Sequence, residues 1–108
     1  GALRLVEVAR ALCAQPHVLL LDEPASGLDA EETEKLSTLL RQIADDGLAI
    51  LLVDHDVDLV FTVADQVYAM VGGRVVAHGD PAAVREDPTV RSVYLAQAPL
   101  ASHAPAGT

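Results

Sequence analysis

Carboxylates and a histidine come after two short apolar runs of the chain, and these side chains suit chemistry on phosphates. Asp22 and Glu23 directly follow the run at residues 18–21. His55 follows the run at residues 48–53, with one residue between. Mg²⁺ prefers oxygen ligands, so a carboxylate fixed at a strand end can hold it beside phosphates, often through water. We therefore expect Asp22 to assist a metal and Glu23 to polarise a water molecule for in-line attack on a terminal phosphate.

Both apolar runs are predicted to be strands of a parallel sheet, which would bring these polar groups together. The runs at residues 18–21 and 48–53 are apolar on both faces, as expected of strands that are covered on both sides. Between them, Asp29 and Glu32 have the spacing of a capping box that begins an amphipathic helix. The order strand, helix, strand predicts a right-handed βαβ unit. Functional groups collect where parallel strands end, so His55 and the carboxylates should share one edge of the sheet.

Further elements are predicted on both sides of the βαβ unit. An amphipathic helix is expected at residues 3–12. We expect one α/β domain at residues 1–97, and a disordered tail at residues 98–108, which are rich in Ala, Pro and Gly. After the unit, we expect a short helix from Asp56 to about residue 64, strands at residues 66–71 and 74–78 joined by Gly72-Gly73, and short helices that begin at Asp80-Pro81 and Asp87-Pro88.

The composition argues against nucleic acid as a direct partner. The formal net charge is −9, from 16 acidic and 7 basic residues, whereas binding to a phosphate backbone requires a basic surface. The longest apolar run, at residues 48–53, is far shorter than the roughly 20 residues that cross a bilayer as a helix. Cys13 is the only cysteine, and we expect it to be a small buried side chain in a helix.

Each candidate residue also has an ordinary structural explanation. Asp22 and Glu23 can start a solvated loop, His55 can lie on the surface or cap a helix, and Asp29 can be an N-cap. The chemical interpretation is favoured because these residues occur together and in this order.

The order of these motifs strongly resembles the ATPase subunits of ABC transporters. The sequence VLLLDEP at residues 18–24 resembles the Walker B strand, SGLD at residues 26–29 resembles the D-loop, and His55 resembles the switch histidine. The opening GALRLVEVARAL at residues 1–12 resembles the end of the signature motif and the helix that follows it. In this comparison Gly1 is the second glycine of the motif, and Ala2 stands where glutamine is usual.

The resemblance implies the C-terminal part of a P-loop NTPase fold, with ATP and Mg²⁺ as cofactors. Asp22 would assist Mg²⁺, and Glu23 would be the general base. His55 would contact the γ-phosphate, Asp29 would lie at a dimer interface, and Gly1 would reach the nucleotide held by the opposite subunit. The implied partners are a second ATPase subunit and transmembrane permease subunits. The implied location is cytoplasmic, peripheral on the inner face of the cell membrane.

The later residues resemble one subfamily in particular, the ATPases of branched-chain amino acid importers. The resemblance lies in VDHD at residues 53–56, GRVVAHGDP at residues 73–81 and VYL at residues 93–95. Those ATPases usually read V-E-H-D and Y-L-G, so Asp54 and Ala96 depart from their pattern. Lipopolysaccharide-export ATPases end in a closely similar way, which leaves export of that lipid as the alternative to amino acid uptake.

One motif of such ATPases is absent from the 108 residues. No G-x-x-x-x-G-K-[ST] sequence occurs, so the chain has no glycine-rich loop and lysine to cradle the β- and γ-phosphates. We therefore expect negligible ATP hydrolysis by this chain alone. Two other functions remain open: a non-catalytic module that pairs with intact ATPases, and an unrelated metal-dependent phosphohydrolase that uses Asp22, Glu23 and residues 54–56. The second gives no role to residues 1–12 or 26–29.

Overall fold

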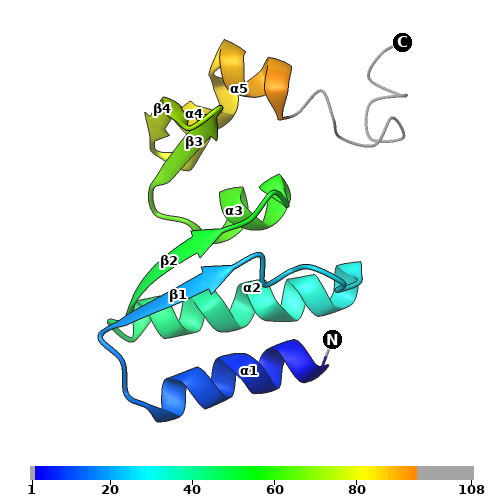
Figure 1. The fold of residues 1–108 in the computed structure, drawn as a ribbon, viewed down its shortest axis with the longest axis vertical. Helices are drawn as coiled ribbons and strands as arrows, with labels where there is room; N and C mark the ends of the chain where they lie inside the picture. Colours follow the sequence, from blue (N-terminus) through cyan, green and yellow to red (C-terminus); the bar gives the residue numbers. More distant parts are fainter. Residues whose placement is uncertain (1, 95–108) are drawn as a thin grey trace. The chain divides into compact units, whose positions relative to one another are not determined.

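A computed structural model of the chain describes residues 2–94 (Figure 1). The chain divides into two compact units with a boundary after Val63, and each is described by itself. Gly1 and the predicted tail at residues 98–108 lie outside the described residues. No helix among residues 2–94 is long and apolar enough to cross a membrane.

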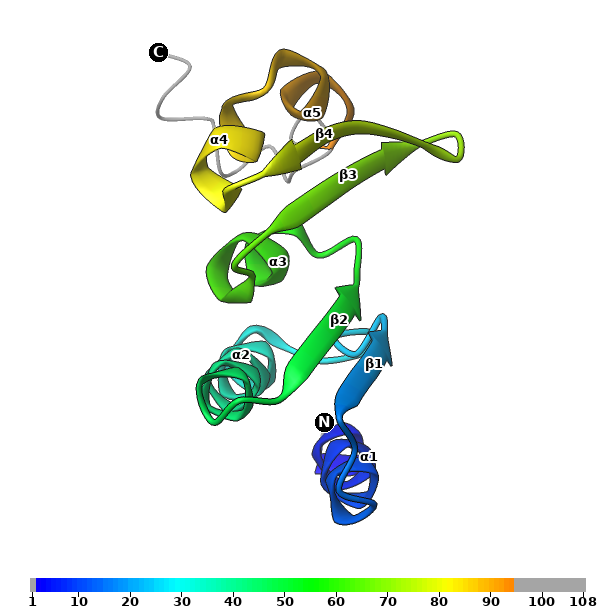
Figure 2. The same cartoon turned by 90° about the vertical axis from the view of Figure 1, so that its left-hand side faces the viewer.

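The first unit contains the predicted βαβ arrangement. Strands β1 and β2 are parallel neighbours, with Val18 opposite Ala49 and Asp22 opposite Val53 (Figures 1 and 2). The βαβ prediction is therefore confirmed, and both strands end at the same edge of the sheet. The elements of this unit are α1 (Ala2–Cys13), β1 (Val18–Asp22), α2 (Ala30–Asp45), β2 (Ala49–Val53) and α3 (Val57–Val63).

Helix α2 begins at the predicted capping box. Asp29 Oδ1 accepts a hydrogen bond from the Glu32 N–H at 2.7 Å, and Glu32 Oε1 accepts one from the Asp29 N–H at 3.2 Å. These bonds satisfy backbone donors that a helix start otherwise leaves unpaired. Leu36 and Leu40 on this helix are almost completely buried. They form a core with residues from the other helices, from β1 and from the loop after β1, namely Val8, Leu19, Ala25 and Leu59.

The prediction that both faces of this sheet are covered is wrong for the described part of the chain. Leu19, Leu21, Ile50 and Leu52 face the core of the unit. Because side chains alternate along a strand, the residues between them point to the opposite face. Exposed fractions on that face are 52–68% for Val18, Leu20, Leu51 and Val53. The helices of this unit pack against one face only, and a sequence that is apolar on both faces does not reveal which residues cover each.

Cys13 is exposed at the end of α1, so the prediction that it is buried is also wrong. The helical pattern places Val8 toward the core. Cys13 lies five residues further along, which is about 140° further around the helix. That rotation takes its side chain away from the buried stripe.

The second unit is a β-hairpin with two short helices packed against it. Its elements are β3 (Val67–Val71), β4 (Arg74–Gly79), α4 (Pro81–Glu86) and α5 (Pro88–Val93). Gly72 and Gly73 both have positive φ, which a two-residue turn between antiparallel strands requires. Asp80 and Asp87 cap the two helices, each with Pro at the first position. The predictions for this region are confirmed.

Candidate functional site

Glu23 lies directly after β1 in an unusual backbone conformation. Its N–H donates to the Val53 carbonyl oxygen at 2.6 Å, which continues the pairing of β1 with β2 by one residue. Its φ is 50°, in the left-handed region that residues other than glycine rarely adopt. The alternation of side chains between the two faces of β1 therefore ends at Glu23. Backbone strain of this kind is found preferentially at functional sites.

Glu23 and His55 contact each other across the ends of the two strands. Glu23 Oε1 lies 2.6 Å from His55 Nδ1. An ionised carboxylate can only accept a hydrogen bond, so in this contact Nδ1 carries the proton. The His55 and Glu23 side chains are 79% and 50% exposed, respectively. An exposed pair of this kind contributes about 0–1 kcal/mol to stability, so it can separate at little cost.

Asp54 is the buried carboxylate of this site, and its place in the sequence indicated no separate role for it. Its side chain is 1% exposed. Its Oδ2 accepts from the Ala25 N–H at 3.2 Å, and its Oδ1 accepts from the Asp56 N–H at 2.9 Å. The signal was present in the alternation of β2, because Asp54 is in phase with the inward-facing residues Ile50 and Leu52. A carboxylate that points inward needs hydrogen-bond donors, and two backbone N–H groups supply them.

Asp22 is exposed at the end of β1, opposite Val53. Among residues 2–94, no group of three or more His, Cys, Asp or Glu side chains is arranged to hold a metal ion. Mg²⁺ is commonly bound by one or two carboxylates together with phosphate oxygens and water. Asp22 therefore fits Mg²⁺ as a single ligand beside bound phosphates. Without such phosphates, the carboxylates and histidines of residues 2–94 do not form a complete set of metal ligands.

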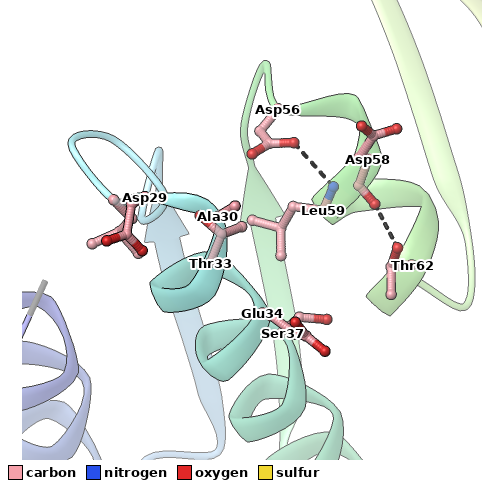
Figure 3. Close-up of a pocket in the computed structure, with 10 residues that line it drawn as sticks. Asp29, Ala30, Thr33, Glu34, Ser37, Asp56, Asp58, Leu59 and Thr62 are labelled. Carbon is pink, nitrogen blue, oxygen red and sulfur yellow. Dashed lines mark hydrogen bonds between the residues drawn. The ribbon is translucent and has the colours of Figure 1, made fainter. Parts of the chain in front are cut away.

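Asp29 makes its hydrogen bonds at the start of α2 and takes no part in the Glu23–His55 contact. It caps α2, and it lines a groove of about 390 Å³ between α2 and α3 (Figure 3). The other polar residues that line the groove are Thr33, Glu34, Ser37, Asp56, Asp58 and Thr62. Within the described chain, no hydrogen bond or ion pair joins Asp22 or Asp29 to Glu23 or His55. Of the predicted site residues, the structure thus joins Glu23 to His55, while Gly1 is outside the described residues.

The backbone at Glu23 leads to a stability prediction. Glu23→Gly should have a free energy of unfolding about 1 kcal/mol higher than Glu23→Ala, because both lose the carboxylate but only glycine adopts positive φ without strain. The measurement is urea-induced unfolding of both variants. Ala49→Gly is the matched control in extended β2, where glycine should instead lower stability by about 0.5–1 kcal/mol. Equal stability of the two Glu23 variants would contradict a strained conformation at this position.

A family model and two related proteins all match this chain to ATP-binding components of transport systems. Residues 74–95 match the family model described as branched-chain amino acid ATP-binding cassette transporter. The high-affinity branched-chain amino acid transport ATP-binding protein LivG of Escherichia coli K12 is 38% identical over 99 residues, which are 91% of this chain and 39% of LivG. The lipopolysaccharide export system ATP-binding protein LptB of the same strain is 37% identical over 97 residues, which are 90% of this chain and 40% of LptB.

Solved structures agree with these relatives. The ADP conformation of MJ1267, an ATP-binding cassette of an ABC transporter, matches with a TM-score of 0.77 and 28% identity over 87% of this chain and 39% of that one. The cbiO1 protein of Clostridium perfringens, part of the ABC transporter complex cbiONQ, matches with a TM-score of 0.68 and 36% identity over 89% of this chain and 39% of that one.

These matches identify the chain as a C-terminal part of an ABC transporter ATP-binding protein. Its fold is the corresponding part of the α/β fold of ABC ATPase cassettes, as the sequence predicted. The chain spans 39% of the length of LivG and 40% of the length of LptB.

Proposed function

We propose that this chain provides the water-activating and phosphate-sensing part of an ATP-hydrolysing site in an ABC transporter subunit. One observation carries the proposal: Glu23 Oε1 and His55 Nδ1 lie 2.6 Å apart where the parallel strands β1 and β2 end. The carboxyl ends of parallel strands are where α/β proteins commonly bind ligands. A carboxylate beside an imidazole at this edge is suited to activate water and to meet a phosphate.

Each predicted site residue has one role in this proposal. Glu23 is the general base that polarises the attacking water. His55 leaves Glu23 and donates a hydrogen bond to the γ-phosphate when ATP is bound, an exchange that costs little because the pair is exposed. Asp22 would hold Mg²⁺ through its carboxylate, and the ion would neutralise negative charge on the phosphates. Asp29 and Gly1 belong to the interface with a second ATPase subunit, where Gly1 meets the nucleotide of that subunit.

The site needs a phosphate-binding part that these 108 residues do not contain. The sequence has no G-x-x-x-x-G-K-[ST] loop, so nothing in it aligns the phosphates with Glu23. We infer that the phosphate-binding part of an ABC ATPase domain packs on the open apolar face of β1 and β2. An exposed apolar face of this kind marks a surface that another polypeptide segment covers. By itself the chain is therefore inactive.

Branched-chain amino acid uptake is the transport function that we favour. The identities to LivG and LptB, 38% and 37%, do not discriminate between amino acid uptake and lipopolysaccharide export. The match of residues 74–95 to the branched-chain family model supports uptake. The proposed partners are a second ATPase subunit and transmembrane permease subunits, with the ATPase in the cytoplasm at the inner face of the membrane.

A chimera tests the proposed function. In it, this chain replaces the matching part of Escherichia coli LivG, so that LivG supplies the phosphate-binding part. We expect the purified chimera to hydrolyse ATP and, in cells that lack LivG, to restore branched-chain amino acid uptake. LivG without the replaced part is the control and should do neither. A folded chimera that binds ATP but does not hydrolyse it would contradict the proposed function, and hydrolysis without uptake would contradict the proposed substrate alone.

A further inference from the structure

Asp54 connects two loops that come from different strands. Asp54 Oδ2 accepts a hydrogen bond of 3.2 Å from the N–H of Ala25, which lies in the loop after β1. Asp54 Oδ1 accepts a hydrogen bond of 2.9 Å from the N–H of Asp56, which lies in the loop after β2. With 1% of its side chain exposed, Asp54 is held between these loops and away from solvent. Hydrogen bonds to an ionised acceptor are roughly twice as strong as neutral ones, so this link is a strong constraint on both loops.

These two loops carry the side chains that form the site. In the first loop, the Ser26 N–H donates to the Glu23 carbonyl at 3.1 Å, so Glu23 and Ala25 belong to one tight turn. In the second loop, Asp56 directly follows His55, and Asp56 Oδ1 accepts from the Leu59 N–H at 3.1 Å. Leu59 is a buried member of the core. A continuous set of hydrogen bonds therefore runs from the core through Asp56 and Asp54 to the turn that begins at Glu23.

We propose that Asp54 is a positioning residue of the hydrolytic site, whose carboxylate fixes both loops and so keeps Glu23 within reach of His55. The inference rests on the proposed function. The exposed contact at 2.6 Å is too weak to fix the loops by itself. The buried carboxylate supplies that order, and it leaves both exposed side chains free to exchange partners.

The chemistry of the two bonds predicts which substitutions keep this role. Two N–H donors reach two different oxygens of Asp54, so both oxygens must accept. Asparagine has the same shape but one acceptor oxygen, and its NH₂ group would face an N–H donor. Glutamate retains two acceptor oxygens. Asp54→Asn should therefore uncouple the loops, and Asp54→Glu should keep them coupled.

Nuclear magnetic resonance on the 108-residue chain tests the coupling without ATP. The measured quantity is the displacement of the His55 ring resonances that Glu23→Gln causes, because the size of this displacement depends on how close the two side chains lie. We expect the displacement caused by Glu23→Gln to be smaller by at least about half in a chain that also carries Asp54→Asn, since residues coupled through a shared hydrogen-bond network do not act additively. Asp54→Glu should restore most of it. Asp46→Asn, the same charge change at an exposed position in the turn before β2, is the matched control and should leave it unchanged.

The outcomes separate positioning from a purely local structural role. An Asp54 that only shapes the loop at residues 54–56 would shift the Asp56 amide resonance in Asp54→Asn but leave the Glu23–His55 displacement intact, and this result overturns the inference. If Asp54→Asn does not fold, Asp54→Ser takes its place, because serine is smaller and can accept from one of the two N–H groups. Neither result depends on hydrolysis, so an inactive LivG chimera would overturn the proposed function without affecting this test.

Discussion

Glu23→Gln is expected to lower kcat for ATP hydrolysis by the LivG chimera by about 10²–10⁴-fold, with little change in ATP affinity. Glutamine preserves the size of the side chain and its exposed position beside His55, but it cannot take a proton from water. ATP binding depends on the phosphate-binding part that LivG supplies, so it should persist. The measurement is steady-state ATP turnover, together with a separate titration of nucleotide binding.

Glu34→Gln is the matched control for this change. Glu34 is an exposed carboxylate on α2, and its substitution removes the same charge. We expect its turnover to equal that of the unmodified chimera. Equal turnover of the Glu23→Gln chimera would show that Glu23 is not the general base, even if the chimera is a working transporter subunit.

Leu36→Ala is expected to lower the free energy of unfolding of the 108-residue chain by about 2–5 kcal/mol. Leu36 is 0% exposed and is a member of the core of the first unit. Truncation to alanine removes buried methyl groups and leaves a cavity that the surrounding helices fill only in part. Because small domains are stable by roughly 5–15 kcal/mol, this loss is a large share of the total. Urea-induced unfolding followed by circular dichroism measures it.

Leu20→Ala is the control for Leu36→Ala, since it makes the same substitution on the open face of the sheet. Leu20 is exposed, so in the chain by itself the change should cost only about 0.5 kcal/mol. In the chimera, where we propose that this face is covered, Leu20→Ala should cost clearly more. If Leu36→Ala and Leu20→Ala lowered the free energy of unfolding of the free chain by similar amounts, the described core would be contradicted.

The order and type of the elements were predictable because local rules decide them. The capping box at Asp29 and Glu32 marks a helix start by its own hydrogen bonds. Gly72 and Gly73 mark a hairpin turn because both adopt positive φ. The apolar runs at residues 18–21 and 48–53 were long enough for strands and too short for helices of the usual length.

Other features depend on contacts that no local pattern encodes. The coverage of the sheet depends on what packs on each face, and alternating apolar residues such as Leu19 and Leu20 look alike in sequence although one is buried and the other exposed. The alternation also indicated that Asp54 points inward, but its two donors come from separate loops and were visible only in the structure. The meeting of Glu23 and His55 at one edge followed from parallel pairing. In their direct contact Glu23 has a left-handed backbone conformation, which no rule of composition predicts.

The most direct test of the central claim compares ATP turnover by the purified 108-residue chain with turnover by the LivG chimera, each with and without Glu23→Gln. We predict turnover by the unmodified chimera and negligible turnover by the other three proteins, because the chain aligns water but not phosphates. Steady ATP hydrolysis by the chain alone, abolished by Glu23→Gln, would contradict the account, since it would show that these residues form a complete site.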